Sequence, residues 1–133
     1  MSRIPHCAIL AALSLLCAGC ATVRYTDQGG KPMVEVTNRG WYLFNLIPLA
    51  SGNPDLPNEC DFRLFKQTTT LENNVRMLDW AATKYHATGI RDVSSYMRDE
   101  SVFFILLKRH AIHTSAELVI PRKDGSTCAS QDR

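Results

Sequence analysis

The sequence predicts an α+β fold in which a small antiparallel sheet, in ββαβββ order, packs against one amphipathic helix. Apolar residues recur at helical spacing in one stretch, between residues 69 and 89. The segments before and after it are rich in β-branched and aromatic residues, and turn-forming residues separate those segments. A chain of 133 residues with 45% hydrophobic and 21% charged residues fits one globular domain with a single core.

Two strands are expected before the helix, over residues 33–38 and 40–47, because both segments are rich in large apolar residues. The tripeptide at 38–40 is interpreted as the hairpin connection between them, and Pro48 as the end of the second strand. Further prolines at 54 and 57 then predict a long irregular loop as far as residue 60.

The helix is the clearest element of the sequence. Thr69, with Glu72 three positions later, matches a capping box, and Gly89 is placed to end the helix. The apolar stripe that is expected to face the sheet consists of Leu71, Val75, Leu78, Ala82 and Tyr85.

Three further strands are expected after the helix, over residues 90–97, 102–107 and 112–120, with a polar turn at 98–101. In the last of these, Ile112, Thr114, Ala116, Leu118 and Ile120 alternate with more polar neighbours. A single helix from 100 to 119 is the competing interpretation, but the β-branched and aromatic residues of this stretch favour strands.

The first 19 residues have the features of an export signal, because Arg3 precedes an uncharged apolar or small run that continues to Gly19. The segment Leu-Cys-Ala-Gly-Cys that ends at Cys20 resembles the lipobox of bacterial lipoproteins, although a cysteine stands in place of its usual first leucine. The resemblance implies cleavage before Cys20 and a lipid on that cysteine, which would anchor the chain to a membrane. An uncleaved transmembrane helix over residues 7–23 is the alternative. In a Gram-negative cell, Ala21 after the cysteine implies the outer membrane, facing the periplasm.

The leader defines the expected domain organisation: a signal peptide at 1–19, a lipidated tether at 20–32, a single α+β domain at 33–121 and a polar C-terminal tail at 122–133. Outside the leader and Cys20, two cysteines remain, Cys60 and Cys128. In an exported protein such a pair predicts a disulfide, with two unpaired thiols as the alternative. Residues 40–120 are similar to small bacterial lipoproteins, including distantly the TRL-like group, through the apolar segment 40–49, the turn at 51–54 and the capped helix that follows. This resemblance implies no activity.

Catalytic, metal and nucleic-acid functions have little support in the sequence. It contains no nucleophile-elbow, zinc-protease or phosphate-loop motif, so neither an enzyme nor a cofactor is expected. His110 and His113 fall on opposite faces of a strand, so no metal site is expected from them. The net charge of +2 is small and its basic residues are scattered, which argues against nucleic acid.

An excess of apolar surface is the most informative functional feature, because residues 40–47 and 103–107 are apolar on both faces whereas only one covering helix is evident. The second face must be covered by the loop 48–68, by another subunit or by a partner. On the helix, Met77, Trp80 and Lys84 lie opposite the predicted stripe and are candidates for partner contact, unless the loop or tail covers them.

These features predict a non-catalytic, lipid-anchored envelope lipoprotein that serves as a docking or structural module. Its expected partner is another envelope protein or a second copy of the chain. The alternative function is a carrier for a small apolar or cell-wall ligand. Its pocket would lie between helix and sheet and would be lined by Trp41, Phe44 and Phe104.

Overall fold

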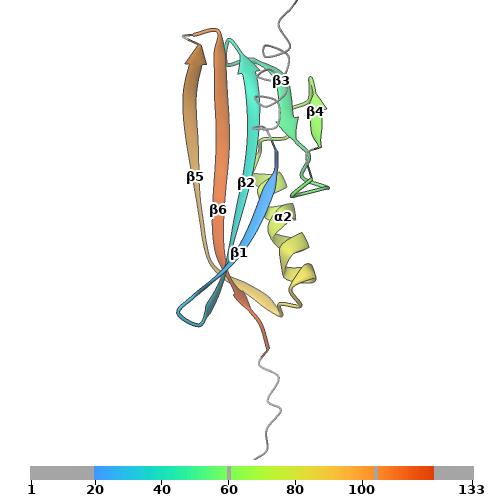
Figure 1. The fold of residues 1–133 in the computed structure, drawn as a ribbon, viewed down its shortest axis with the longest axis vertical. Coiled ribbons are helices and arrows are strands. Elements are labelled where there is room, and N and C mark those ends of the chain that lie inside the picture. The colour runs from blue at the N-terminus through green and yellow to red at the C-terminus, as the bar shows by residue number, and fades with distance from the viewer. Residues whose placement is uncertain (1–19, 60, 104, 122–133) are drawn as a thin grey trace, which may run out of the picture.

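The computed structural model describes residues 20–59, 61–103 and 105–121. These residues form an elongated, twisted antiparallel sheet with one helix against it (Figure 1), which confirms the predicted α+β class. The elements are β1 (Thr22–Gln28), β2 (Lys31–Leu43), β3 (Ile47–Gly52), β4 (Phe62–Leu64), α2 (Leu71–Lys84), β5 (Gly89–Phe103) and β6 (Leu107–Val119).

Strand β2 organises the sheet, whose strand order is β4-β3-β2-β6-β5. One edge of β2 pairs with β6 along residues 33–43. Its other edge is shared, because β1 pairs with residues 31–37 and β3 with residues 40–43. Strand β5 therefore ends the sheet on one side, and β1 and β4 end it on the other.

Two expected turns are strands in the structure. Residues 38–40 continue β2, and the polar residues 98–101 continue β5. Polar side chains are accommodated there because they pair across the ladder: Asp99 contacts His110, and Glu100 forms an ion pair with Arg109. The prediction of a separate strand at 102–107 is wrong, because β5 ends at Phe103 and β6 begins at Leu107.

The N-terminal residues also differ from the expectation, because residues 22–28 form β1 instead of a tether. Ala21 and Val23 are buried, and two hydrogen bonds fix this segment: the Asn58 N–H donates to the Ala21 carbonyl at 2.9 Å, and the Val23 N–H donates to Asn58 Oδ1 at 2.8 Å. The domain therefore begins at about residue 21. Pro48, expected to end a strand, lies within β3.

Helix α2 begins one residue later than its capping box suggests, because the Thr70 side chain accepts a hydrogen bond from the Asn73 N–H at 3.2 Å. Its buried residues are Asn74, Met77, Leu78 and Ala81. Leu78 of the predicted stripe is thus confirmed, and Ala82 and Tyr85 also pack against the core. Leu71 and Val75, expected to face the sheet, are each 53% exposed. The reason is Asn74, whose amide donates to the Ile112 carbonyl at 2.9 Å and to Thr114 Oγ1 at 3.0 Å.

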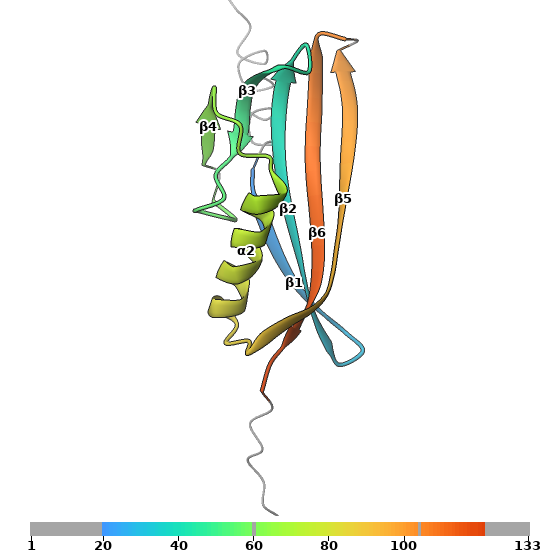
Figure 2. The same ribbon diagram turned by 180° about the vertical axis from the view of Figure 1, so that it is seen from behind.

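The core lies between α2 and one face of the sheet. On the sheet it contains Ala21, Val23, Val34, Val36, Ala116 and Leu118, which meet Met77, Leu78 and Ala81 of the helix. Figure 2 shows α2 on the side of β1 and β2, with most of β5 away from the helix. No helix among the described residues is long and apolar enough to cross a membrane.

Candidate functional site

The helix residues expected to contact a partner are placed differently from one another. Met77 is fully buried at the centre of the core, so its assignment to a contact surface is wrong. Trp80 is half-buried and packs against that core, and the Lys84 Nζ lies 4.6 Å from the centroid of its ring. Trp80 and Lys84 therefore remain accessible and take part in a surface groove.

The ligand pocket expected between helix and sheet is not formed by Trp41 and Phe44. Trp41 alternates with the core residues of β2, so it belongs to the opposite face, where the Arg109 guanidinium lies 5.8 Å from its ring. Phe44 is 49% exposed in the turn after β2. Phe104 lies outside the described residues. The helix–sheet interface is instead filled by the core side chains.

Cys20, the expected lipidation site, is half-buried and directly precedes the buried Ala21. Only Ala21 separates it from β1. Cys60 and Cys128, the leader 1–19 and the tail from residue 122 lie outside the described residues.

The two histidines of β6 face opposite sides of the sheet, as expected. His110 Nδ1 lies 2.5 Å from Asp99 Oδ1, and its ring contacts Tyr42 edge-on. His113 stacks on Tyr96, and its Nδ1 lies 3.0 Å from Thr37 Oγ1. Within the described ranges, no three side chains of His, Cys, Asp or Glu come together as metal ligands would.

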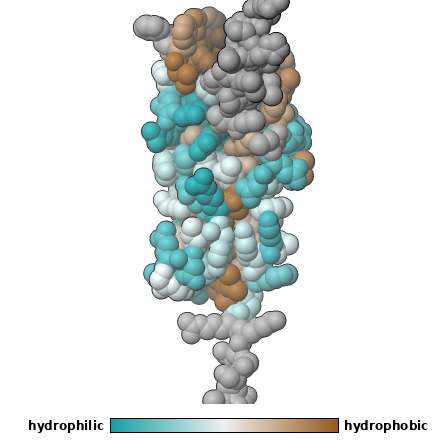
Figure 3. All heavy atoms as spheres, viewed as in Figure 1, coloured by the Kyte–Doolittle hydropathy of each residue, from teal (hydrophilic) through white to brown (hydrophobic). Residues whose placement is uncertain are grey.

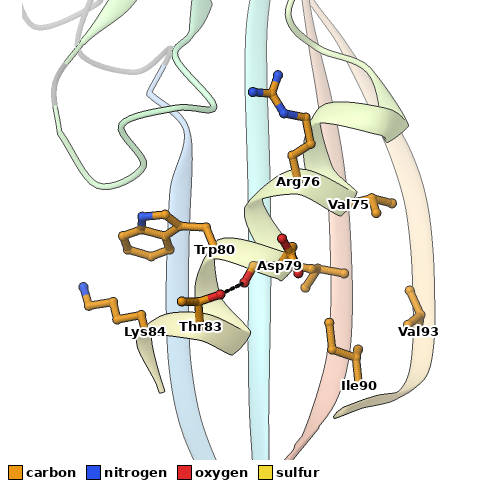
Figure 4. A pocket seen from close by; sticks show the side chains of 9 residues that line it. Val75, Arg76, Asp79, Trp80, Thr83, Lys84, Ile90 and Val93 are labelled. Atoms are coloured by element: carbon orange, nitrogen blue, oxygen red, sulfur yellow. Dashed lines mark hydrogen bonds between the residues drawn. The ribbon is translucent and has the colours of Figure 1, made fainter. Parts of the chain in front are cut away.

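A groove of about 810 Å³ lies along α2 and the first residues of β5 (Figure 4). Its apolar walls come from the helix residues Val75 and Leu78 and from Ile90 and Val93 of β5. Val75 and Val93 are more than half exposed. The rest of the lining is on the helix and consists of Trp80 and the polar side chains of Arg76, Asp79, Thr83 and Lys84. The groove therefore combines an accessible apolar surface with charged side chains.

Strand β5 beside this groove has an unpaired edge. It pairs with β6 alone, and nearly all of its residues are exposed. A bulge interrupts the β5–β6 pairing between Arg91 and Ser94, and Asp92 there has a φ of 51°. From Ser94 onward the strand is regular as far as Ser101. An unpaired edge beside apolar pockets is the arrangement that receives an extended peptide as an added strand.

Glu100 of β5 is surrounded by arginines on the sheet face that lies away from α2. The hydrogen bond from Arg109, followed by the positive charges of Arg109, Arg98 and Arg39, keeps the pKa of Glu100 below its ordinary value of 4.5 despite an opposing effect of desolvation. Glu100 is therefore ionised at neutral pH and held by two ion pairs, to Arg98 and Arg109.

Sequence reasoning missed a third surface, at the end of the sheet where β2 and β5 finish. Two turns meet there, because the Phe44 N–H donates to the Leu106 carbonyl at 2.8 Å. The apolar tip, as we name this surface, consists of the exposed side chains of Phe44, Leu46, Ile47, Phe103, Ile105 and Leu106. Strongly hydrophobic residues gather at this end of the molecule in Figure 3. The apolar runs were visible in the sequence, but their meeting at one end was not.

The groove, the β5 edge and the apolar tip each expose a surface suited to binding. Comparison of the chain with protein-family models, with curated proteins and with solved structures found no match.

Proposed function

We propose that this chain is a non-catalytic lipoprotein of the cell envelope, anchored through a lipid on Cys20, whose domain docks an extended segment of another envelope protein along β5. The observation that carries the docking proposal is the groove between α2 and β5 beside the unpaired β5 edge. A strand added at β5 satisfies backbone donors and acceptors that the edge leaves open. Its alternate side chains would enter the apolar groove beside Val75 and Val93.

An extended segment fits this surface better than a small carried ligand. Ligand carriers enclose most of the ligand surface, whereas this groove is open to solvent and flanked by charged side chains such as Arg76 and Asp79. Of the three residues predicted to line a carrier pocket, Trp41 lies on the sheet face away from the helix and Phe44 is half-exposed in a turn, so neither lies between helix and sheet. Protein docking is therefore the function that the groove and the edge support together.

The anchor is supported by the lipobox-like sequence that ends at Cys20, and it is tested by Cys20→Ser in the full chain. The wild-type chain should incorporate a labelled fatty acid and shorten by the length of the leader. The variant should remain unlabelled at full length. Equal labelling of the two chains would refute the anchor.

The docking surface is tested with a photo-crosslinking residue at Val93 or Met97, introduced into the full chain in intact envelopes. Both side chains are more than half exposed, and both belong to β5. The matched control position is Asp27, which is also exposed but lies in the β1–β2 hairpin. We expect discrete products from the β5 positions alone, with one contiguous stretch of the same partner mapped by mass spectrometry. Val75→Asp should reduce their yield at least about tenfold, because a charge would enter the apolar wall.

Three results would contradict docking of another protein at this surface. Absence of a product from both β5 positions would do so, and so would equal products from Asp27. A product of twice the mass of the chain would identify the added strand as a second copy, which would replace the proposed partner.

A further inference from the structure

The apolar tip is built from two tight turns that are joined as one unit. In the first, the Leu46 N–H donates to the Leu43 carbonyl at 3.1 Å, and in the second, the Leu106 N–H donates to the Phe103 carbonyl at 3.0 Å. The bond from Phe44 to Leu106 links the turns. Leu46 is 81% exposed and Ile105 is 76% exposed, so the turns present large apolar side chains to solvent. Such a concentration at one end of a domain indicates a binding surface.

The backbone at Phe44 supports this interpretation. Phe44 and Asn45 have φ values of 50° and 61°, which lie in the left-handed region, and they are the two central residues of the turn closed by the bond from Leu46 to Leu43. Glycine or asparagine adopts this conformation readily, whereas a bulky aromatic residue is strained in it. A strained position occupied by an exposed aromatic side chain is typical of a functional site.

The course of the chain at Cys20 sets which end of the domain would approach a membrane. Strand β1 is antiparallel to β2, with Thr22 opposite Thr37, so the chain that precedes Thr22 runs toward the end of β2 that carries Phe44. At roughly 3.3 Å per residue, Thr37 and Phe44 lie about 23 Å apart along β2. Only Ala21 stands between Cys20 and β1, so an acylated Cys20 keeps the domain against the bilayer without slack. A tilt of the elongated domain brings Cys20 and the tip to the same surface.

Charges around the tip favour an anionic lipid surface. Lys108 follows the second turn, at the start of β6. The nearest carboxylates of β5, Asp99 and Glu100, already contact His110 and Arg109. A lysine beside an exposed apolar surface binds anionic headgroups while the apolar side chains enter the upper acyl region.

We propose that the apolar tip inserts into the interfacial region of the bilayer, as a second membrane contact beside the lipid on Cys20. This inference rests on the proposed envelope anchor for its orientation. The tip would hold the domain in a defined orientation, with β5 directed along the membrane surface. The lipid alone would leave the domain free to rotate.

The test uses the unlipidated chain from residue 20 to residue 133 with Cys20→Ser, which retains every element and core residue described above. Its binding to sedimented vesicles of phosphatidylethanolamine and phosphatidylglycerol is compared with that of Leu46→Asp/Ile105→Asp. The matched control is Leu71→Asp, which places an aspartate at an exposed apolar residue outside both the groove and the tip. We expect the double variant to bind at least about tenfold more weakly and the control to bind as the parent does.

Folding is checked by the urea midpoint of each chain, which should be unchanged because the three substituted side chains are exposed. Absence of vesicle binding by the parent chain would overturn the proposal, as would equal losses in the double variant and in Leu71→Asp. Tip-dependent dimers without vesicle binding would overturn it too, because the tip would then be a contact between copies. The chain in this test carries no lipid, so its result is independent of whether Cys20 is acylated.

Discussion

Met77→Ala should destabilise the protein strongly, although helical periodicity alone places Met77 on the solvent side of α2. The side chain is fully buried among Val34, Val36 and Leu118 in the core cluster. Removing its atoms beyond Cβ loses about 0.8 kcal/mol of transfer free energy for each methylene-sized group, or roughly 2.5 kcal/mol in all. The cavity that remains adds about 24 cal/mol per Å³ that does not collapse, so the expected loss is about 3 to 4 kcal/mol.

Leu71→Ala is the matched comparison, because Leu71 belongs to the stripe that the sequence directs at the sheet but is 53% exposed in the structure. Its truncation should lower the free energy of unfolding by about 1 kcal/mol or less. Urea denaturation followed by circular dichroism measures both losses, provided that the slope with urea is the same in all three chains. A larger loss from Leu71→Ala than from Met77→Ala would mean that α2 presents the other face to the sheet.

Three further predictions concern a buried hydrogen bond, a close packing contact and a surface ion pair. Asn74→Ala should lower the free energy of unfolding by about 1 to 3 kcal/mol, because it removes the donor to the Ile112 carbonyl, and an unchanged urea midpoint would contradict this. Gly40→Ala should cost about 1 to 3 kcal/mol in the same assay, because a Cβ there would lie 2.5 Å from Thr69 Oγ1 and 2.9 Å from Tyr42 Cε2, and a neutral result would show that Thr69 can move away. The pKa of Glu100 is lower in the folded protein than its ordinary 4.5, chiefly through the Arg109 hydrogen bond, so its contribution to stability is present above about pH 4.5 and is lost as the pH falls through the lowered pKa. Glu100→Gln should flatten the fall of the thermal midpoint below pH 4.5, and an unaltered pH profile would refute this role.

The parts of the fold that follow from local patterns were predictable from the sequence. The alternation in 112–120 was confirmed, since Ile112, Thr114, Ala116 and Leu118 are all buried. The helix was also found, because its capping signal and apolar spacing are local. Its buried face was predicted only in part, because Leu78 is buried as expected but Asn74 takes the place of Leu71 and Val75 through bonds to β6, which is far away in the sequence.

Strand β1 and the apolar tip were missed for different reasons. The signal for β1 was present, because residues 22–26 include Thr, Val and Tyr and the Gly29-Gly30 pair closes a two-residue hairpin to β2, but the polar and glycine residues of this stretch were interpreted as a tether. The tip depends on a contact between Phe44 and Leu106 that no local pattern specifies. The candidate docking groove likewise combines residues of α2 and β5. They lie close together because α2 leaves Val75 exposed beside the start of β5.

The position of β2 at the centre of the sheet has a consequence for folding. Residues 33–43 of β2 pair with residues 107–117 of β6. One whole edge of the central strand therefore stays unpaired until the last of the described strands has been made. The entropy cost of closing so long a loop slows folding, and a truncated or nascent chain lacks the half of the sheet formed by β6 and β5. For a chain exported as proposed above, late closure would be an advantage, because a polypeptide that has not yet collapsed around β2 can still be threaded across a membrane.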